Sequence, residues 1–321
     1  MKKKVIFISF DGILDNLGKS QITSYLFKLN NYYKITLVSL ENKNKTKEEF
    51  INIKRKYTNL NIDWIKLNFS KIPILGFFIN FSKIFFIILF LIVFKKIKYF
   101  HCRSLMPSII CYYLNLFFKI QYLFDMRGFW IDEKSDRKNL SKNNISYKYI
   151  KYLENKILQN SSQIISLTNQ AKGIIQIKNR IDKEKIHIIP TCADMKKFHR
   201  NKKLNNKNDL IFCYLGTIDG AYDLEIVLNY FNKLNQEYNN TYLKILTNQQ
   251  FKLKKILHKY NKNKNITFNS VNNEKIVNYL NDVDFGIFYL KDNYSIKASF
   301  PTKISEYLSL GIPIITNPYN L

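Results

Sequence analysis

Short apolar runs alternate with longer stretches of helical spacing along almost the whole chain, and this alternation constrains the fold most strongly. In the first part of the chain, the runs have the length and continuity of strands buried on both faces of a parallel sheet, and they occupy residues 5–10, 33–40, 62–67, 99–103, 121–125, 163–167 and 186–190. Helical spacing lies between them at residues 20–29, 107–118 and 147–158. Strands that alternate with helices predict an α/β fold.

The pattern stops and then restarts once. Residues 196–208 are rich in Lys and Asn without apolar periodicity, which predicts a linker. After them we expect a helix at 224–234 and strands at 210–215, 242–247, 266–268, 285–289 and 312–316. A length of 321 residues suits two domains. We therefore predict two Rossmann-like α/β/α domains facing across a cleft, at residues 1–195 and 209–321. The second is expected to be incomplete because Leu321 follows a strand directly.

The chain is strongly basic, with 51 Lys and Arg against 24 Asp and Glu and a net charge of +27. Such a field attracts nucleic acid, anionic lipid headgroups or phosphorylated small molecules. The abundance of Lys, Asn, Ile, Tyr and Phe throughout is also what an AT-rich genome produces without selection for binding. No RNP-like, zinc-finger or helix-turn-helix pattern occurs, so we expect no nucleic-acid partner.

The cysteines and the first residues both favour a cytoplasmic protein. The four cysteines show neither metal-ligand spacing nor a disulfide framework, and they are Cys102, Cys111, Cys192 and Cys213. The apolar run at the start of the chain ends after six residues, at Asp11 and Gly12. It is too short for the apolar region of a signal peptide, and we interpret it as the first strand.

Residues 84–94 are eleven consecutive apolar residues, flanked by Lys83 on one side and by Lys95, Lys96 and Lys98 on the other. A helix that spans a bilayer needs about twenty, so we do not expect a transmembrane span. Two interpretations remain open. The segment is a buried helix packed on the sheet, or it is an interfacial helix whose basic flanks suit anionic headgroups. The second would place the protein peripherally on the inner face of the plasma membrane.

The strongest motif lies at residues 297–316, where a loop with Pro301 is followed by a helix from about Thr302 and then a strand. We expect Thr302 to cap this helix, whose free N–H groups would form an anion site. Lys303, in the first turn, would neutralise a diphosphate. Glu306 shares the same helix face and would accept hydrogen bonds from ribose hydroxyls. The alternative is a solvated ion pair between the two side chains.

This stretch resembles the donor-binding motif of the retaining glycosyltransferases of family 4, also called glycosyltransferase group 1. A subset of that family has the pattern Ser-x-Pro-Thr-Lys-x-x-Glu-Tyr-Leu-x-x-Gly-x-Pro-x-Ile. The matching residues are Ser299, Pro301, Thr302, Lys303, Glu306, Tyr307, Leu308, Gly311 and Pro313. The wider family carries two glutamates eight positions apart. Glu306 matches the second, and Ala298 stands where the first would be.

Four further segments resemble the family in the same order along the chain, so the resemblance spans nearly all of it. Residues 9–21 resemble the first glycine loop, with Gly12 and Gly18, and the others are residues 101–108, 124–130 and 189–198. The resemblance implies the two-domain GT-B fold.

Two polar residues stand at the ends of predicted strands, where open α/β sheets bind ligands. His101 and Asp125 are candidates to orient or deprotonate an acceptor hydroxyl. The alternatives are a purely structural histidine and a local ion pair of Asp125 with Arg127.

The loop after the first strand of the second domain departs from the family. Many members carry an arginine just after the glycine of this loop and a lysine a few residues later, and this pair holds the diphosphate. Here Gly216 and Thr217 begin a loop without a basic residue. Neutralisation of the diphosphate would fall to Lys303 and the helix end, with Arg103 and Arg127 as further candidates.

The resemblance implies transfer of a sugar, with retention, from a nucleotide-diphosphate donor to a saccharide or lipid-linked acceptor in surface polysaccharide biosynthesis. The candidate catalytic residues are His101, Asp125 and Glu306. No cofactor is expected besides the sugar nucleotide as co-substrate, and no metal, because Asp and His show no metal-ligand spacing. Two alternatives remain open: a non-catalytic homologue that acts as a partner subunit, and a basic nucleic-acid-binding protein.

Overall fold

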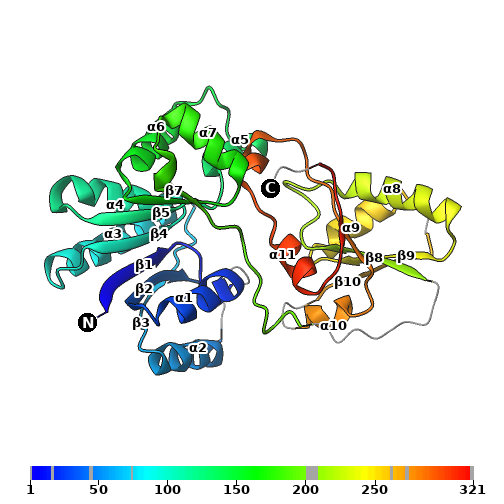
Figure 1. Cartoon of the computed structure of the whole chain (residues 1–321), viewed down its shortest axis with the longest axis horizontal. Helices are drawn as coiled ribbons and strands as arrows, with labels where there is room; N and C mark the ends of the chain where they lie inside the picture. The colour runs from blue at the N-terminus through cyan, green and yellow to red at the C-terminus, as the bar shows by residue number, and fades with distance from the viewer. Residues whose placement is uncertain are drawn as a thin grey trace. The chain divides into compact units, whose positions relative to one another are not determined.

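A computed structural model describes residues 2–15, 18–42, 46–73, 75–199, 209–260, 263–271 and 275–318 (Figure 1). The chain forms two compact units, Met1–Pro190 with Lys297–Ser299, and Thr191–Ile296 with Phe300–Leu321. Each unit is built around one parallel β-sheet with helices packed against it. The predicted α/β fold class is confirmed.

The first unit contains a seven-stranded sheet in the order β3-β2-β1-β4-β5-β6-β7. The strands are β1 (Lys3–Ser9), β2 (Tyr33–Glu41), β3 (Asp63–Asn68), β4 (Tyr99–Arg103), β5 (Gln121–Asp125), β6 (Gln163–Ser166) and β7 (Ile186–Ile188). All neighbours pair in parallel, and all seven were predicted. The chain builds outward from β1 to β3 and then returns to place β4 beside β1. The carboxyl ends of β1 and β4 therefore form the switch point at which such sheets bind ligands.

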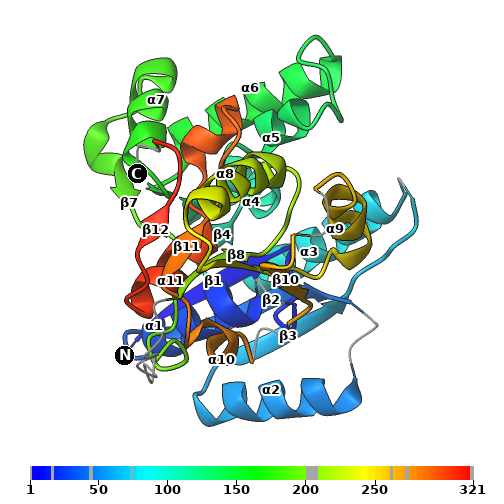
Figure 2. The same ribbon diagram turned by 90° about the vertical axis from the view of Figure 1, so that its right-hand side faces the viewer.

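Helices cover both faces of this sheet. They are α1 (Ser24–Leu29), which follows a π-helical turn (Gly18–Thr23), α2 (Lys47–Asn59), α3 (Leu75–Val93), α4 (Leu105–Phe118), α5 (Trp130–Asp136), α6 (Ile145–Asn160) and α7 (Asn169–Asn179). Helix α2, which we had not predicted, lies beside β3 (Figures 1 and 2). Thr46 and Glu49 form a reciprocal capping box at its start. Helices α3, α4 and α6 contact one another in sequence and share the other face.

Helix α3 is longer than the sequence indicated. It begins at Leu75, nine residues before the uninterrupted apolar run, and has nineteen residues. The prediction that this segment is too short to span a membrane is therefore wrong about length. Within the described part of the chain, α3 is the one helix that is long and apolar enough to cross a membrane, judged by length and composition. Ile84, Ile88 and Leu91 are nevertheless buried in the unit's core.

The second unit contains a five-stranded parallel sheet in the order β10-β9-β8-β11-β12. Its strands are β8 (Leu210–Leu215), β9 (Thr241–Leu246), β10 (Ile266–Asn269), β11 (Phe285–Ile287) and β12 (Ile314–Ile315), each at a predicted position. Its helices are α8 (Leu224–Glu237), α9 (Gln250–Leu257), α10 (Ile276–Leu280) and α11 (Thr302–Ser309). Of the predicted linker, residues 200–208 lie outside the described residues. Residues 191–199 group with this unit.

A tyrosine fixes α11 against this sheet. Tyr307 is fully buried, and its hydroxyl donates a hydrogen bond of 2.8 Å to the backbone carbonyl of Cys213 on β8. Its ring occupies the space beside Gly286 on β11, where an added Cβ would lie 2.6 Å from ring carbons. The absence of a side chain at Gly286 therefore allows α11 to pack where it does. Helix α11 carries Lys303 and Glu306.

We expect Gly286→Ala to lower the free energy of unfolding by about 1–3 kcal/mol, because the anchored ring cannot move away from the new methyl group. Gly173→Ala is the matched control. That glycine lies within α7 with open space around its Cβ position. This change should stabilise the protein by about 0.5–1 kcal/mol. Urea unfolding measures both, and equal effects of the two changes would contradict the packing argument.

Candidate functional site

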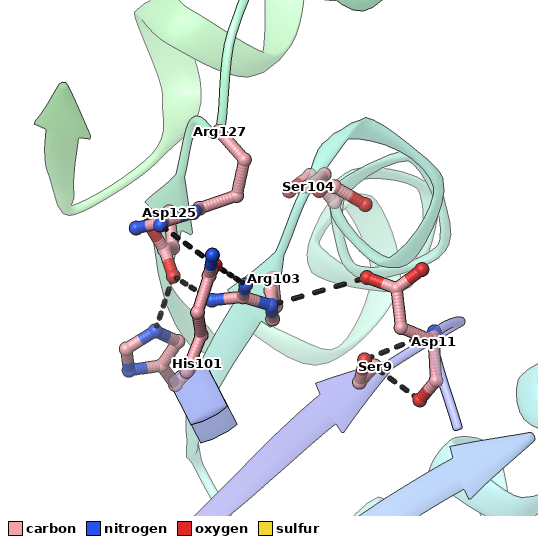
Figure 3. Close-up of polar contacts among 9 residues, drawn as sticks. Ser9, Asp11, His101, Arg103, Ser104, Asp125 and Arg127 are labelled. Atoms are coloured by element: carbon pink, nitrogen blue, oxygen red, sulfur yellow. Dashed lines mark hydrogen bonds and ion pairs between the residues drawn. The ribbon is translucent and has the colours of Figure 1, made fainter. Parts of the chain in front are cut away.

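Five charged or titratable side chains converge at the carboxyl edge of the first sheet (Figure 3). His101 and Arg103 lie on β4, Asp125 ends β5, and Asp11 and Arg127 follow β1 and β5 directly. The parallel register pairs Arg103 with Asp125, so these two strand ends are adjacent. The structure thus brings together His101, Arg103, Asp125 and Arg127, four of the candidate site residues that we had predicted, and adds Asp11, which we had not.

Asp125 is the centre of this cluster. Its Oδ2 lies 3.3 Å from His101 Nε2 and 3.7 Å from an Arg103 nitrogen, and its Oδ1 lies 3.6 Å from an Arg127 nitrogen. Burial by itself raises the pKa of Asp125. The hydrogen bond with His101 and the charges of Arg127, His101 and Arg103 outweigh burial and lower that pKa to about 2. A carboxylate held ionised in this way is a weak base, and its position fits an anchor for guanidinium groups better than a proton acceptor.

His101 is enclosed by aromatic side chains. Its ring centroid lies 4.4 Å from that of Phe7 and 5.8 Å from that of Tyr25, and the side chain is nearly inaccessible. One of its ring nitrogens is engaged with Asp125. These contacts suit a residue that positions Asp125.

The two arginines are joined by an amide. Gln21 Oε1 accepts hydrogen bonds of 2.6 Å from Arg103 and 3.1 Å from Arg127. Burial and the neighbouring charge of Arg127 lower the pKa of Arg103 to about 10, which leaves it charged at neutral pH. Arg103 is buried, whereas the side chain of Arg127 is 20% exposed and is the cation that solvent reaches. The cluster therefore offers a cationic group to an anionic or hydroxyl-rich ligand.

The first glycine loop folds tightly beside this cluster. A Cβ on Gly18 would lie 2.0 Å from the carbonyl oxygen of Gly12, so no side chain fits there. The buried carboxylate of Glu41, at the end of β2, accepts hydrogen bonds from the backbone N–H groups of Ile13 at 2.8 Å and Leu14 at 3.5 Å. Our sequence analysis missed Glu41. Its signal was an acidic residue at the end of an otherwise mainly apolar strand.

In the second unit, Lys303 lies in the first turn of α11 and is buried. Its Nζ stands over the rings of Tyr222 at 3.7 Å, Tyr214 at 4.5 Å and Phe288 at 5.2 Å from the centroids. The Nζ has no hydrogen-bond partner among the described residues. Burial lowers the pKa of Lys303 to about 7, although the charge of Glu306 opposes the shift. When it is protonated, the lysine is thus an ammonium group held by ring faces, without a counter-ion within hydrogen-bonding distance among the described residues.

The surroundings of Lys303 differ from two expectations. Glu306 is also buried, which raises its pKa against the opposing charges of Lys197 and Lys303, so a solvated ion pair is excluded. Pro301, not Thr302, occupies the N-cap of α11, and Thr302 is its first residue. Proline can take this position because its fixed φ, here −59°, is compatible with the turn into a helix. The helix start consequently has no side-chain cap.

The loop after β8 lies against Lys303. Gly216 has a φ of +102°, and an added Cβ would meet Lys303 Cε at 3.7 Å. The carbonyl of Thr217 accepts a hydrogen bond of 2.6 Å from the hydroxyl of Tyr214. Among the predicted donor-site residues, this unit contains Gly216, Thr217, Pro301, Thr302, Lys303 and Glu306.

Ser299 belongs to the other unit. It lies in the segment Lys297–Ser299, which groups with the first unit, where Thr168 Oγ1 donates a hydrogen bond of 2.5 Å to the carbonyl of Lys297. Within the described ranges, no group of three His, Cys, Asp or Glu side chains is placed to hold a metal ion.

We expect Asp125→Asn to lower the free energy of unfolding at neutral pH by about 3–5 kcal/mol, because two guanidinium groups lose their buried counter-ion. The pKa of Asp125 lies below the ordinary value of about 3.9. Its stabilisation is therefore present above about pH 4 and is lost as the pH falls towards 2. Urea unfolding across this range should show the two proteins converging in acid. The control Asp11→Asn, at a half-exposed carboxylate 4.0 Å from Arg103, should cost at most about 1 kcal/mol. An equal loss in both variants would contradict the assignment.

The second part of the chain is similar to a known family. Residues 195–320 match the model of a family described as "Glycosyl transferases group 1". Over 204 residues the chain is 22% identical to the Bacillus subtilis (strain 168) protein named "Putative teichuronic acid biosynthesis glycosyltransferase TuaH". That alignment covers 61% of this chain and 50% of TuaH, so the chain spans about half the length of this relative.

Solved structures share the architecture at low sequence identity. Anabaena Alr3699/HepE, solved with UDP and glucose, aligns with 98% of this chain and 80% of its own at a TM-score of 0.66 and 10% identity. A sucrose-phosphate synthase from Thermosynechococcus elongatus aligns over 98% and 81% at a TM-score of 0.67 and 13% identity. At such identity the likeness concerns the fold. The chain has the GT-B fold with two Rossmann-like units, and its residues 195–320 resemble the group 1 glycosyltransferases.

Proposed function

We propose that this protein transfers a sugar from a nucleotide-diphosphate donor to a saccharide or lipid-linked acceptor in the synthesis of a surface polysaccharide. Retention at the anomeric carbon is the part of this proposal that rests on the motif at residues 299–313 alone. The match of residues 195–320 to the group 1 family supports the reaction class. The name of TuaH, which refers to teichuronic acid biosynthesis, supports the polysaccharide.

The observation that carries the proposal is the buried Nζ of Lys303. A buried cation without a hydrogen-bonded counter-ion is costly, and a bound anion would offset that cost. Lys303 lies within the matched region and beside Gly216. No basic residue follows Gly216 before α8 begins, so Lys303 supplies the positive charge from α11 instead. A protonated Lys303 would also stabilise the charge that develops on the leaving nucleotide diphosphate.

The other candidate residues have roles consistent with this arrangement. Glu306 lies on the same helix one turn beyond Lys303 and would accept hydrogen bonds from ribose hydroxyls. In the first unit, Arg127 and Gln21 would bind an anionic or hydroxyl-rich acceptor, with Asp125 and His101 holding the arginine in place.

We expect Lys303→Met to weaken nucleoside diphosphate binding about tenfold to hundredfold, the loss of one contact to a charged group. Titration calorimetry with UDP, GDP, ADP and TDP first identifies the base, and the matching nucleoside and pyrophosphate then complete the set. Pyrophosphate should lose affinity with the diphosphate, and the nucleoside should not. Methionine fills the aromatic cage formed by Tyr214, Tyr222 and Phe288 without adding a charge, so the melting temperature should stay the same or rise. Diphosphate affinity within about twofold of wild type would place the donor elsewhere.

Two further variants sharpen that comparison. Lys254→Met removes an exposed lysine of α9 and should leave all affinities unchanged. Glu306→Gln should weaken nucleosides while leaving pyrophosphate binding largely intact. Wild-type protein that binds the nucleotide but neither hydrolyses nor transfers any donor sugar would favour a non-catalytic subunit over an enzyme.

We also expect nucleotide binding to take up a proton. Because burial lowers the pKa of Lys303 to about 7, the amine is mostly neutral at pH 8 in the free protein. A bound diphosphate stabilises the ammonium form and raises that pKa, so about one proton should enter per nucleotide at pH 8 and fewer below pH 6. Calorimetry in two buffers of different ionisation enthalpy measures this uptake. Uptake that persists in Lys303→Met would assign the proton to another group.

A further inference from the structure

Helix α3 has a second apolar side that no described residue covers. Five residues of this side have exposed fractions between 45% and 65%, and they are Leu75, Phe78, Phe86, Phe90 and Val93. At 100° per residue, these positions fall within a stripe about 120° wide along the whole helix. The residues that pack into the core lie on other sides of the helix. Large exposed apolar stripes of this kind mark interaction surfaces.

The end of α4 extends this surface. Its last three residues, Leu116, Phe117 and Phe118, are exposed, Phe117 by 79%. Helices α3 and α4 contact each other, and each runs from the carboxyl end of one parallel strand to the amino end of the next. They therefore end at the same edge of the sheet. We group the exposed stripe of α3, the residue that follows it and the exposed end of α4 under the name α3–α4 surface, which comprises Leu75, Phe78, Phe86, Phe90, Val93, Phe94, Leu116, Phe117 and Phe118.

The charged residues that follow α3 and α4 in the chain are basic. Lys95, Lys96 and Lys98 follow α3, Lys119 follows α4, and all four are exposed. Residues 64–124 contain no Asp or Glu but eight Lys and Arg. A partner protein that covered only the apolar stripe would not account for this basic rim. An anionic bilayer accounts for both features, because it offers hydrocarbon to the phenylalanines and headgroups to the lysines.

The packing of α3 decides how it meets a bilayer. The helix connects β3 to β4, and its buried residues Ile84, Ile88 and Leu91 belong to the core of the first unit. A transmembrane orientation would remove those side chains from the core. A helix lying in the plane of the interface keeps them in place and inserts only the outer stripe.

We propose that the α3–α4 surface docks the protein on an anionic lipid bilayer, with α3 parallel to the membrane plane. The exposed phenylalanines enter the boundary between headgroups and acyl chains, and the four lysines contact lipid phosphates. This docking does not depend on the proposed transfer reaction. It adds a lipid bilayer to the binding partners proposed for the protein.

Co-sedimentation of the full chain with vesicles tests the proposal. The protein should bind vesicles of phosphatidylcholine with phosphatidylglycerol, bind pure phosphatidylcholine weakly, and lose affinity as salt increases. Phe86→Ser, Phe90→Ser and Phe117→Ser should each reduce the partition coefficient roughly tenfold. Lys95→Gln and Lys96→Gln should each reduce it roughly fivefold. The controls Ile177→Ser and Phe251→Ser, at residues of α7 and α9 that are more exposed than Phe86 and Phe90, should leave it unchanged.

Nucleotide titration and melting temperature separate docking from folding and from donor binding. The serine variants should keep wild-type values for both, and Lys303→Met should keep wild-type vesicle binding. In a Phe90→Trp variant, tryptophan emission should shift to the blue when anionic vesicles are added. The proposal is overturned if the protein ignores anionic vesicles, if the controls lose as much binding as the phenylalanine variants, or if those variants instead dissociate a dimer of this chain in solution.

Discussion

Removing a charge from water costs free energy unless a counter-charge or hydrogen bonds offset the loss, and the two units meet this constraint in opposite ways. In the first, Asp125 lies among His101, Arg103 and Arg127, and its charge is balanced within the protein. In the second, the Nζ of Lys303 has only aromatic ring faces around it. The first arrangement pairs opposite charges within the protein, although Asp125 Oδ1 and Arg103 Nε have no hydrogen-bond partner among the described residues. In the second, the proposed function would supply the missing counter-charge as the diphosphate of a bound nucleotide.

The strand pattern could be predicted because most strands are short, mainly apolar runs, and the parallel order of the strands placed their polar ends together. The length of α3 could not be predicted in the same way. Asn80 interrupts the apolar pattern, yet in the structure it is buried, with its amide accepting from the N–H of Ser70 and donating to the carbonyl of Ser70. A polar residue satisfied by a loop ten positions earlier looks the same in sequence as one that faces water.

The part of the candidate donor site that lies within a single segment could be predicted from the sequence. Lys303 and Glu306 share a helix, so their spacing alone placed them on one face. The aromatic cage comes from β8, from the loop before α8 and from the residue after β11. No spacing rule connects those three segments. Glu41 was missed for a similar reason, since its partners lie 27 and 28 residues earlier in the chain.

Helix α3 packs on the sheet with one side and exposes its apolar stripe on another, and this arrangement has a consequence for substrates. A helix is about 10–12 Å across with its side chains, so a bilayer that lies against α3 would stand about one helix diameter from the strands of the sheet. The charged cluster at the ends of β4 and β5 would then be held at a fixed height above the headgroups. A sugar attached directly to a lipid would fall short of that height. An acceptor raised on a phosphate bridge or on sugars already added would reach it, so the thickness of one helix would act as a ruler for acceptor length.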